Sequence, residues 1–420
     1  MSWKETCAMS ERMRFIGEML QPQCNVTELC RRYGISRKTG YKWAERYRDG
    51  GVAALAERSH APLQQAQAVD VSLVQLLVQS RHQHPSWGPR KLLAWLLKRH
   101  PRADWPAAST VGQILRRHGL VQPRKRHVSA TGARYGSALV EAYGPNVVWC
   151  TDFKGQFRTQ DQIYCYPLTL TDAFSRYLLV CRGMLSPTTQ GVRPWFERAF
   201  REHGLPCVIR SDNGSPFATQ GLVGLSRLAI WWIKLGIIPE RIVPGCPQQN
   251  GRHERMHKTL KQETTTPAAA NLRAQQRVFD RFVAEFNQER PHEALGQRPP
   301  ARVYAASQRQ YPPRIPRIEY PQDYLVRTVY PTGEIKIGGH RVFVSETLAG
   351  EPLGLVQIDE TLWRLHFASM PLALLDARVM RIRPLENPAD HENNKDRGAS
   401  PPDPLKTPYN REKVLPISPV

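Results

Sequence analysis

The feature that most constrains the fold is a series of strand-like segments in the middle of the chain. Val147–Asp152 is apolar and ends in a carboxylate, and strand-like segments follow at Ile163–Leu170 and Tyr177–Arg182. A helical pattern and a fourth strand, Leu205–Arg210, come next. Consecutive strands followed by alternating helices and strands predict an α/β layer fold, which we expect to occupy residues 140–305.

Residues 1–60 predict a helix-turn-helix domain. Gly34 separates two short helical segments, for which Thr27 and Ser36 are the expected N-caps. In such a domain the second helix enters the major groove of DNA. A helical hairpin with solvated charges would show the same pattern, and this segment alone leaves both interpretations open. The candidate DNA contacts at the start of the second helix are Arg37, Lys38 and Lys42.

A second helix-turn-helix or winged-helix-like domain is expected at residues 69–128. Pro89 stands near the start of one helix, and Ser109 or Thr110 can cap another, which Gly119 ends. A basic linker follows, and a solvated connector is the simpler interpretation of such a run. The candidate DNA contacts here are Arg90, Lys91, Arg124, Lys125 and Arg126.

The C-terminal part predicts a small β-barrel-like domain at residues 315–383. Tyr324–Val344 alternates between apolar and polar residues, and the pair Gly338-Gly339 is a hairpin signal. Residues 384–420 are rich in proline and poor in apolar residues, which predicts a disordered tail.

The charge of the chain points to a polyanionic partner. The formal net charge is +22 and the sequence pI is about 10.0. Basic side chains release the counterions that surround DNA, so such a surplus favours nucleic-acid binding. Charge alone does not exclude a basic protein without such a partner.

The cysteines and the hydropathy indicate a cytoplasmic protein. The eight Cys residues are scattered, with no C-x-x-C pair and no Cys/His cluster at zinc-ligand spacing. We see no secretory signal and no apolar run long enough to span a membrane. A reducing compartment is therefore expected.

Three acidic residues are the candidate catalytic centre. Asp152 ends the first strand, Asp212 ends the fourth, and Glu254 lies early in a predicted helix. If these two strands are neighbours, both aspartates emerge at one edge of the sheet. Three crowded carboxylates cannot all stay ionised without a cation. Magnesium prefers oxygen ligands, and two ions about 4 Å apart stabilise an in-line displacement at phosphorus.

Each of these acids also has a purely structural explanation. Asp152 could belong to a turn, the sequence at 211–214 is turn-forming on composition alone, and Glu254 is a favourable charge in a first helical turn. Other carboxylates, such as Asp172, are also available. Spacing alone does not choose among them.

Three motifs in order resemble the integrase catalytic core that retroviral integrases share with many bacterial transposases. They are Trp149–Asp152, Arg210–Phe217 and Pro247–Arg255. The closer similarity is to bacterial insertion-sequence transposases of the 481 group, which the segment Phe286–Leu295 also resembles.

The resemblance implies an RNase H-like core in which Asp152, Asp212 and Glu254 form a DDE triad that binds two magnesium or manganese ions. It implies cleavage at the ends of a DNA element, followed by attack of the 3′-hydroxyl on target DNA. Its partners would be double-stranded DNA, as terminal inverted repeats and target, and further copies of the chain, since two ends must be held together. The location would be the bacterial cytoplasm, at the nucleoid.

The predicted helix around Glu254 adds candidate DNA contacts. Lys258 and Lys261 follow Glu254 at i+4 and i+7 and so lie on the same helical face. A solvated basic face with a Glu–Lys pair is the alternative. Asn250 and Gly251 are expected to form a tight turn before this helix. The other candidate DNA contacts near the triad are Asn213, Asn250 and Arg252.

Together these patterns predict a DDE transposase. The main alternative is a catalytically silent, transposase-derived DNA-binding regulator, which would need a broken triad. A nuclease of the same fold that never joins DNA, and a basic chromatin protein, are the remaining alternatives.

Overall fold

The computed structural model describes residues 7–57, 69–121, 139–219, 224–243 and 246–385. The predicted linker residues Arg124, Lys125 and Arg126 lie outside the described residues, as does the predicted disordered tail from residue 386 onward. The chain divides into two compact units, Met1–Asp70 and Val71–Val420.

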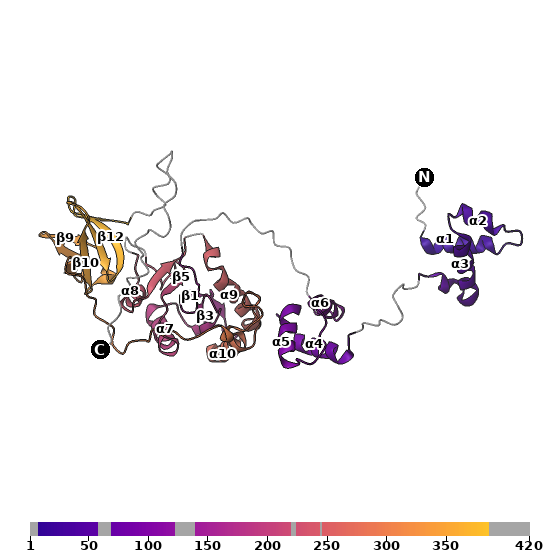
Figure 1. Ribbon diagram of the computed structural model, residues 1–420, viewed down its shortest axis with the longest axis horizontal. Helices are drawn as coiled ribbons and strands as arrows, with labels where there is room; N and C mark the ends of the chain where they lie inside the picture. Colours follow the sequence, from indigo (N-terminus) through magenta and orange to yellow (C-terminus); the bar gives the residue numbers. More distant parts are fainter. Residues whose placement is uncertain (1–6, 58–68, 122–138, 220–223, 244–245, 386–420) are drawn as a thin grey trace. The chain divides into compact units, whose positions relative to one another are not determined.

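The first unit is a small helical domain (Figure 1). Its elements are α1 (Ala8–Met19), α2 (Val26–Arg32), α3 (Arg37–Gly50) and the 3-10 helix η1 (Val52–Leu55). Ser36 caps α3 as predicted, because its side chain accepts a hydrogen bond from the backbone N–H of Thr39. The cap of α2 is Asn25 and not Thr27, since the Asn25 side chain accepts from the N–H groups of Thr27 and Glu28.

Gly40 allows α3 to pack closely against the other two helices. A Cβ atom at this position would lie 2.7 Å from Cys30 Sγ and 3.0 Å from Phe15 Cζ. The core around it consists of Phe15, Ile16, Leu29, Cys30, Trp43 and Leu55. The helix-turn-helix packing therefore requires glycine at position 40.

The second unit begins with three helices, α4 (Val71–Gln83), α5 (Pro89–Arg99) and α6 (Ala108–Arg117). The predicted caps of α6 are wrong, because Ala107 precedes the helix and no side chain caps it. Leu92 and Leu96 of α5 are buried, whereas Leu97 is 45% exposed.

A mixed sheet forms the centre of the second unit. Its strands are β1 (Val148–Phe153), β2 (Phe157–Arg158), β3 (Tyr164–Asp172), β4 (Leu178–Met184), β5 (Val208–Ser211) and β6 (Ile238–Arg241). Strands β2, β3, β1, β5 and β6 are hydrogen-bonded in that order, and β4 also pairs with β3. The β1–β5 and β5–β6 pairs are parallel and the others are antiparallel. The first strand and the strand that leads to Asp212 are neighbours, which is the condition under which both aspartates emerge at one edge of the sheet.

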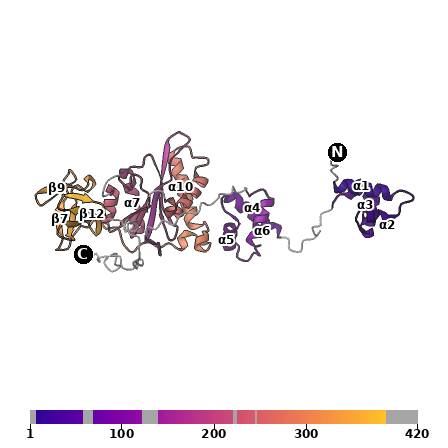
Figure 2. The ribbon, with the colours of Figure 1, turned by 90° about the horizontal axis from the view of Figure 1, so that it is seen from above.

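Helices cover both faces of this sheet, as the views in Figures 1 and 2 show for α7 and α10. The helical elements are α7 (Thr189–His203), α8 (Arg227–Lys234), η2 (Pro247–Asn250), α9 (Gly251–Thr264), α10 (Leu272–Gln288), η3 (Glu293–Leu295) and η4 (Pro300–Arg302). One core contains Trp149, Phe196 and Trp232, from β1, α7 and α8. A separate core contains residues of α9 and α10, among them Leu260 and Phe279.

The C-terminal part of the second unit is all β, as predicted. Its elements are β7 (Leu325–Thr328), β8 (Glu334–Ile337), β9 (His340–Phe343), η5 (Glu346–Leu348), β10 (Pro352–Gln357), β11 (Leu362–Phe367), β12 (Met370–Asp376) and β13 (Arg381–Arg383). Strands β13, β12, β11, β10 and β7 form one sheet, and β8 pairs with β9 in a second. The predicted Gly338-Gly339 hairpin turn joins β8 to β9, with positive φ at both residues.

Helix α8 belongs to two cores. Trp231 and Trp232 pack with α7 and the central sheet, whereas Ile230 and Ile233 belong to the core of the C-terminal sheets. Lys234 adds an ion pair with Glu351 at 2.8 Å. A helix that is apolar all round is typical of a buried position, and here it joins the central sheet to the C-terminal part.

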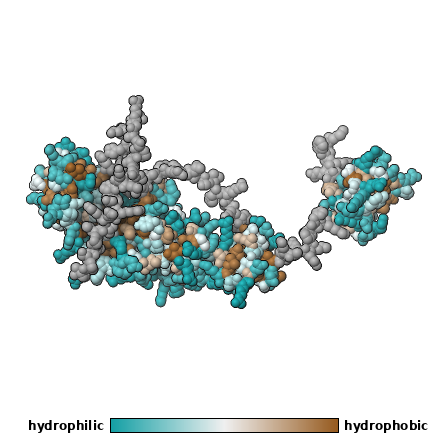
Figure 3. Space-filling view, viewed as in Figure 1, coloured by the Kyte–Doolittle hydropathy of each residue, from teal (hydrophilic) through white to brown (hydrophobic). Residues whose placement is uncertain are grey.

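The surface visible in Figure 3 is mostly hydrophilic on each part of the chain. No helix among the described residues is long and apolar enough to cross a membrane.

Two helical glycines in the first unit give a matched test of its packing. Gly17→Ala, in α1, meets nothing within 4 Å, so it should stabilise the domain by about 0.5–1 kcal/mol through lower backbone entropy in the unfolded chain. Gly40→Ala forces a Cβ against Cys30 and should destabilise it by about 1–3 kcal/mol. Hydrogen exchange of the α1–α3 amides measures both. Equal protection in the two variants would contradict the packing described for Gly40.

Candidate functional site

The β1–β5 pairing brings two of the predicted acids to the same level of the sheet. Cys150 pairs with Arg210 in the parallel register, and Asp152 and Asp212 each follow two residues later. Asp212 begins a tight turn in which its Oδ1 accepts from the N–H of Gly214 at 3.1 Å. A Cβ on Gly214 would lie 3.0 Å from Asp212 Oδ2, so a larger residue there would have to displace the carboxylate slightly.

The third acid, Glu254, lies in the first turn of α9 and is exposed. The expected tight turn at Asn250 and Gly251 is not formed, because the 3-10 helix η2 leads directly into α9. Asn250 is buried, and its Oδ1 has no hydrogen-bond partner among the described residues.

The three charges influence one another. Burial raises the pKa of Asp152 to about 7, and repulsion from Asp212 and, more weakly, Glu254 adds to the shift. Among the described residues, however, no three His, Cys, Asp or Glu side chains lie close enough to hold one metal ion. Both findings agree physically, because charge repulsion extends over many ångströms whereas a magnesium–oxygen bond spans about 2 Å.

Asp172, the other available carboxylate, has a structural role. It is fully buried, and it accepts hydrogen bonds from Asn146 N and from Ser175 N and Oγ at 2.6–2.7 Å. It pairs with Trp149, at the opposite end of β1 from Asp152. The structure thus assigns Asp172 and Asp152 to different ends of the strand and different surroundings, a distinction that the sequence alone did not make.

Helix α9 carries two histidines that sequence analysis missed. His253 and His257 are 2% and 4% exposed, and both Nε2 atoms lie within hydrogen-bond distance of Thr169 Oγ1 on β3. Burial lowers the pKa of His253 to about 3, and burial also lowers that of His257. His257 Nδ1 is 3.6 Å from Asp152 Oδ2. The i, i+4 spacing of the histidines was the sequence signal, since it places them on one helical face.

Apart from the buried Asn250, the predicted DNA contacts near the acids are exposed, and two of them also donate hydrogen bonds within the chain. Lys258 and Lys261 are exposed on α9. Arg252 donates to the backbone oxygen of Ala173 at 3.2 Å. The Asn213 side chain donates to Ile242 O at 2.8 Å, which ties its loop to the end of β6.

The predicted contacts in the helical modules differ in the same way. Arg37, Lys38 and Lys42 are exposed on α3. Arg90 is exposed as well and forms an ion pair with Glu293 at 2.7 Å, and partial burial lowers the pKa of Lys91 to about 8. To contact a DNA phosphate, Arg90 would have to exchange the carboxylate of Glu293 for the phosphate.

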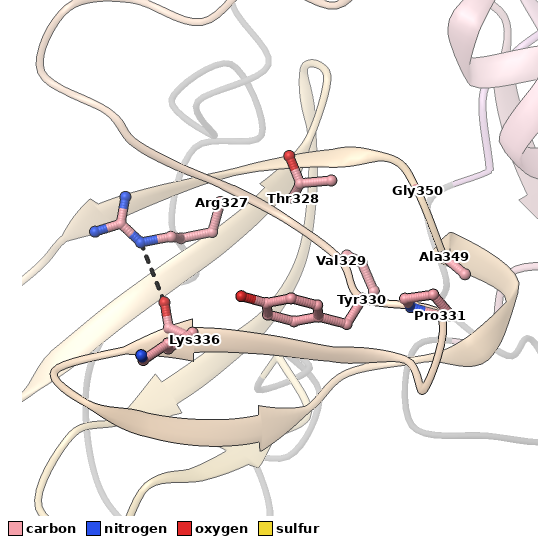
Figure 4. A pocket seen from close by; sticks show the side chains of 8 residues that line it. All are labelled: Arg327, Thr328, Val329, Tyr330, Pro331, Lys336, Ala349 and Gly350. Carbon is pink, nitrogen blue, oxygen red and sulfur yellow. Dashed lines mark hydrogen bonds between the residues drawn. The ribbon is translucent and has the colours of Figure 1, made fainter.

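A cavity of about 580 Å³ lies in the C-terminal part, well separated in sequence from the three acids (Figure 4). Its walls include Tyr330 and the basic residues Arg327 and Lys336, with Arg327 Nε donating to Lys336 O at 3.1 Å. No acidic side chain lines it, so it does not have the ligands of a divalent-metal site.

Comparison with known families agrees with this arrangement. Residues 142–247 and 235–300 match integrase core domains, residues 11–62 match a helix-turn-helix domain, and residues 39–115 match a homeodomain-like domain. The chain therefore contains an integrase core preceded by helix-turn-helix domains, as predicted.

Curated relatives fall into two groups. An uncharacterized protein of insertion element IS407 from Burkholderia multivorans is 26% identical, over 54% of this chain and 79% of its own length. A protein of insertion element IS2A from Escherichia coli is 28% identical, over 51% of each chain. The Pol polyprotein of Feline endogenous virus ECE1 is 32% identical over 29% of this chain, but the match covers only 11% of the polyprotein. The chain is thus related to proteins of bacterial insertion elements.

Among solved structures, the HTLV-2 integrase catalytic core domain in complex with magnesium matches 39% of this chain and all of its own. The identity is 17% and the TM-score is 0.32.

His292 offers a test of the electrostatics in this unit. Burial lowers its pKa to about 3, and the nearby Lys91, Arg290 and Arg176 contribute. In the unfolded chain the pKa of this histidine is near 6.5, so below that pH the unfolded state binds a proton that the folded state does not. The free energy of unfolding therefore falls by about 1.4 kcal/mol per pH unit as the pH drops from about 6.5 toward 3. In His292→Phe, the loss of unfolding free energy between about pH 7 and pH 5 should be smaller by about 2 kcal/mol.

Denaturant unfolding at the two pH values measures this difference, with His340→Phe, at an exposed histidine, as the control. The same pH dependence in His292→Phe and in the unsubstituted chain would refute the burial of a neutral imidazole.

Proposed function

We propose that this chain is a DNA transposase, a metal-dependent polynucleotidyl transferase that cleaves DNA at element ends and joins the 3′-hydroxyl to target DNA. The observation that carries the proposal is the β1–β5 register, which sets Asp152 and Asp212 at one level of the sheet, with the charge of Glu254 also acting on Asp152. The integrase core match and the insertion-element relatives support the same class of reaction.

In this proposal Asp152, Asp212 and Glu254 are the catalytic and metal-binding residues. Carboxylate oxygens suit magnesium or manganese, and the raised pKa of Asp152 fits a site whose mutual repulsion a divalent cation would relieve. When bound, two such ions would supply charge for the attacking and leaving oxygens of an in-line displacement. Among the described residues the three acids do not share one coordination sphere, so binding such an ion needs a change in their spacing.

The proposed partner is double-stranded DNA, as element ends and as target. The net charge of +22 supports this partner, and so do the helix-turn-helix matches. Two ends must be held together, so we propose a homo-oligomer, at the nucleoid of a bacterial cytoplasm. The proposed DNA contacts are Arg37, Lys38, Lys42, Arg90, Lys91, Arg124, Lys125, Arg126, Asn213, Asn250, Arg252, Lys258 and Lys261.

The proposed domain layout follows the sequence boundaries. Helix-turn-helix domains occupy 1–60 and 69–128, the catalytic core 140–305 and a small β domain 315–383, before a tail at 384–420. The helical, mixed and all-β elements fall within these ranges.

The test is a strand-transfer assay with duplex DNA from the sequence that flanks the gene, in the presence of magnesium. Asp212→Asn should abolish joined products, because one charged metal ligand is lost, while DNA binding in a gel-shift assay is kept. Asp323→Asn, at an exposed aspartate of the C-terminal part, is the matched control and should retain activity.

The alternatives predict different products. A catalytically silent regulator would bind the DNA and give no metal-dependent product. A nuclease would give cleaved but never joined DNA. Full joining activity in Asp212→Asn would rule out the proposed triad.

A further inference from the structure

The proposed chemistry does not account for a group of buried polar side chains between β3 and α9. Thr169 Oγ1 lies 2.8 Å from His253 Nε2 and 2.6 Å from His257 Nε2. The same hydroxyl donates to the backbone oxygen of Asp152 at 3.0 Å. Thr171 Oγ1 lies 2.7 Å from His253 Nδ1. We call Thr169, Thr171, His253 and His257 the Thr–His cluster.

The hydrogen bonds of the cluster fix its protons. A threonine hydroxyl has one hydrogen and two lone pairs, and a carbonyl oxygen can only accept. Since Thr169 donates to Asp152 O, both Nε2 atoms must donate to Thr169. His253 Nδ1 then accepts from Thr171. Thr169 Oγ1 thus uses its full hydrogen-bonding capacity, one hydrogen donated and two accepted.

The cluster connects two of the proposed metal ligands. Thr169 is the register partner of Asp152 in the β1–β3 ladder. Glu254 follows His253 directly and precedes His257 by three residues, within the first two turns of α9. One hydroxyl therefore links the backbone at Asp152 to the helical turn that carries Glu254.

Packing alone does not require polar groups here. On the same buried face of α9, Met256 between the two histidines and Leu260 beyond them belong to an apolar core with side chains of the sheet and α10. Apolar side chains hold a helix on a sheet without the cost of burying imidazoles, which is repaid only when every polar atom is paired. The polar contact occurs at the end of α9 that carries Glu254, where direction and spacing matter more than burial.

We propose that Thr169 is a positioning residue that, through His253 and His257, sets the spacing between the Asp152 and Glu254 carboxylates for a divalent cation. The inference rests on the proposed function, because these residues touch no substrate and would act only through Asp152 and Glu254. Groups that orient metal ligands usually change metal affinity or activity roughly 10–100-fold when they are removed.

The experiment compares Thr169→Val, Thr169→Ser and Thr264→Val in the full chain. Valine has the shape of threonine but no hydroxyl, whereas serine keeps the hydroxyl. Thr264 is a buried threonine at the other end of α9 whose hydroxyl donates to Leu260 O of its own helix. The readouts are manganese binding to the DNA-free chain, by electron paramagnetic resonance of the free ion, and joined DNA product.

Thr169→Val is expected to weaken manganese binding roughly 10–100-fold and to lower joining to a similar extent. Thr169→Ser should restore most of the affinity, and Thr264→Val should bind manganese like the unsubstituted chain. If the unsubstituted chain binds manganese and joins DNA, but Thr169→Val behaves like Thr264→Val, the positioning role is overturned alone. If the unsubstituted chain does neither, the proposed function fails and the positioning role fails with it.

A second pair of variants covers the case in which Thr169→Val does not fold. His257→Gln can place an amide N–H where Nε2 lies, whereas His257→Asn is too short to reach Thr169. Weaker manganese binding in the Asn variant than in the Gln variant supports the positioning role. Equal binding in the two overturns it.

Discussion

The parallel pairing of β1 with β5 is the interaction on which the candidate site depends. Its register sets residue 152 level with residue 212, and the antiparallel pairing of β1 with β3 sets Thr169 beside Asp152. A slip of one residue in either ladder would turn these side chains to the other face of the sheet. The buried side chains of the strands, such as Trp149 and Ile209 in the α7–α8 core, oppose such a slip.

The structural features that were predicted correctly are those that depend on local sequence pattern. Apolar strands ending at Asp152 and near Asp212 made the two aspartates candidates, and the Gly338-Gly339 pair predicted a hairpin turn, whereas the pairing of the two strands was only assumed. Local pattern gave a wrong prediction where two nearby residues could both cap the same helix. Asn25 caps α2 in place of Thr27 because both residue types accept hydrogen bonds from a helix start, and only packing selects the first turn.

The Thr–His cluster could not be predicted in the same way, because its hydrogen bonds join threonines and histidines that are 82 to 88 positions apart along the chain. Threonine in a strand is ordinary by propensity, and nothing near Thr169 marks it as the partner of a helix. The histidine spacing on α9 showed that two imidazoles share a face, but not whether that face is exposed or buried. For the same reason the sequence left Asp172 open, whereas its three buried donors settle its role.

Helix α9 presents two kinds of surface, and the difference explains how a buried cluster can serve an exposed acid. Glu254, Lys258 and Lys261 are exposed, whereas His253, Met256 and His257 are buried. An exposed carboxylate gains little orientation from its own contacts, because solvated side chains move freely among rotamers. Its placement must come from the backbone of the helix, and the buried face sets that backbone. The strand orients Asp152 directly, whereas Glu254 is oriented only through the helix that carries it. Contacts between α9 and β3 are therefore the ones most able to change the geometry of the site.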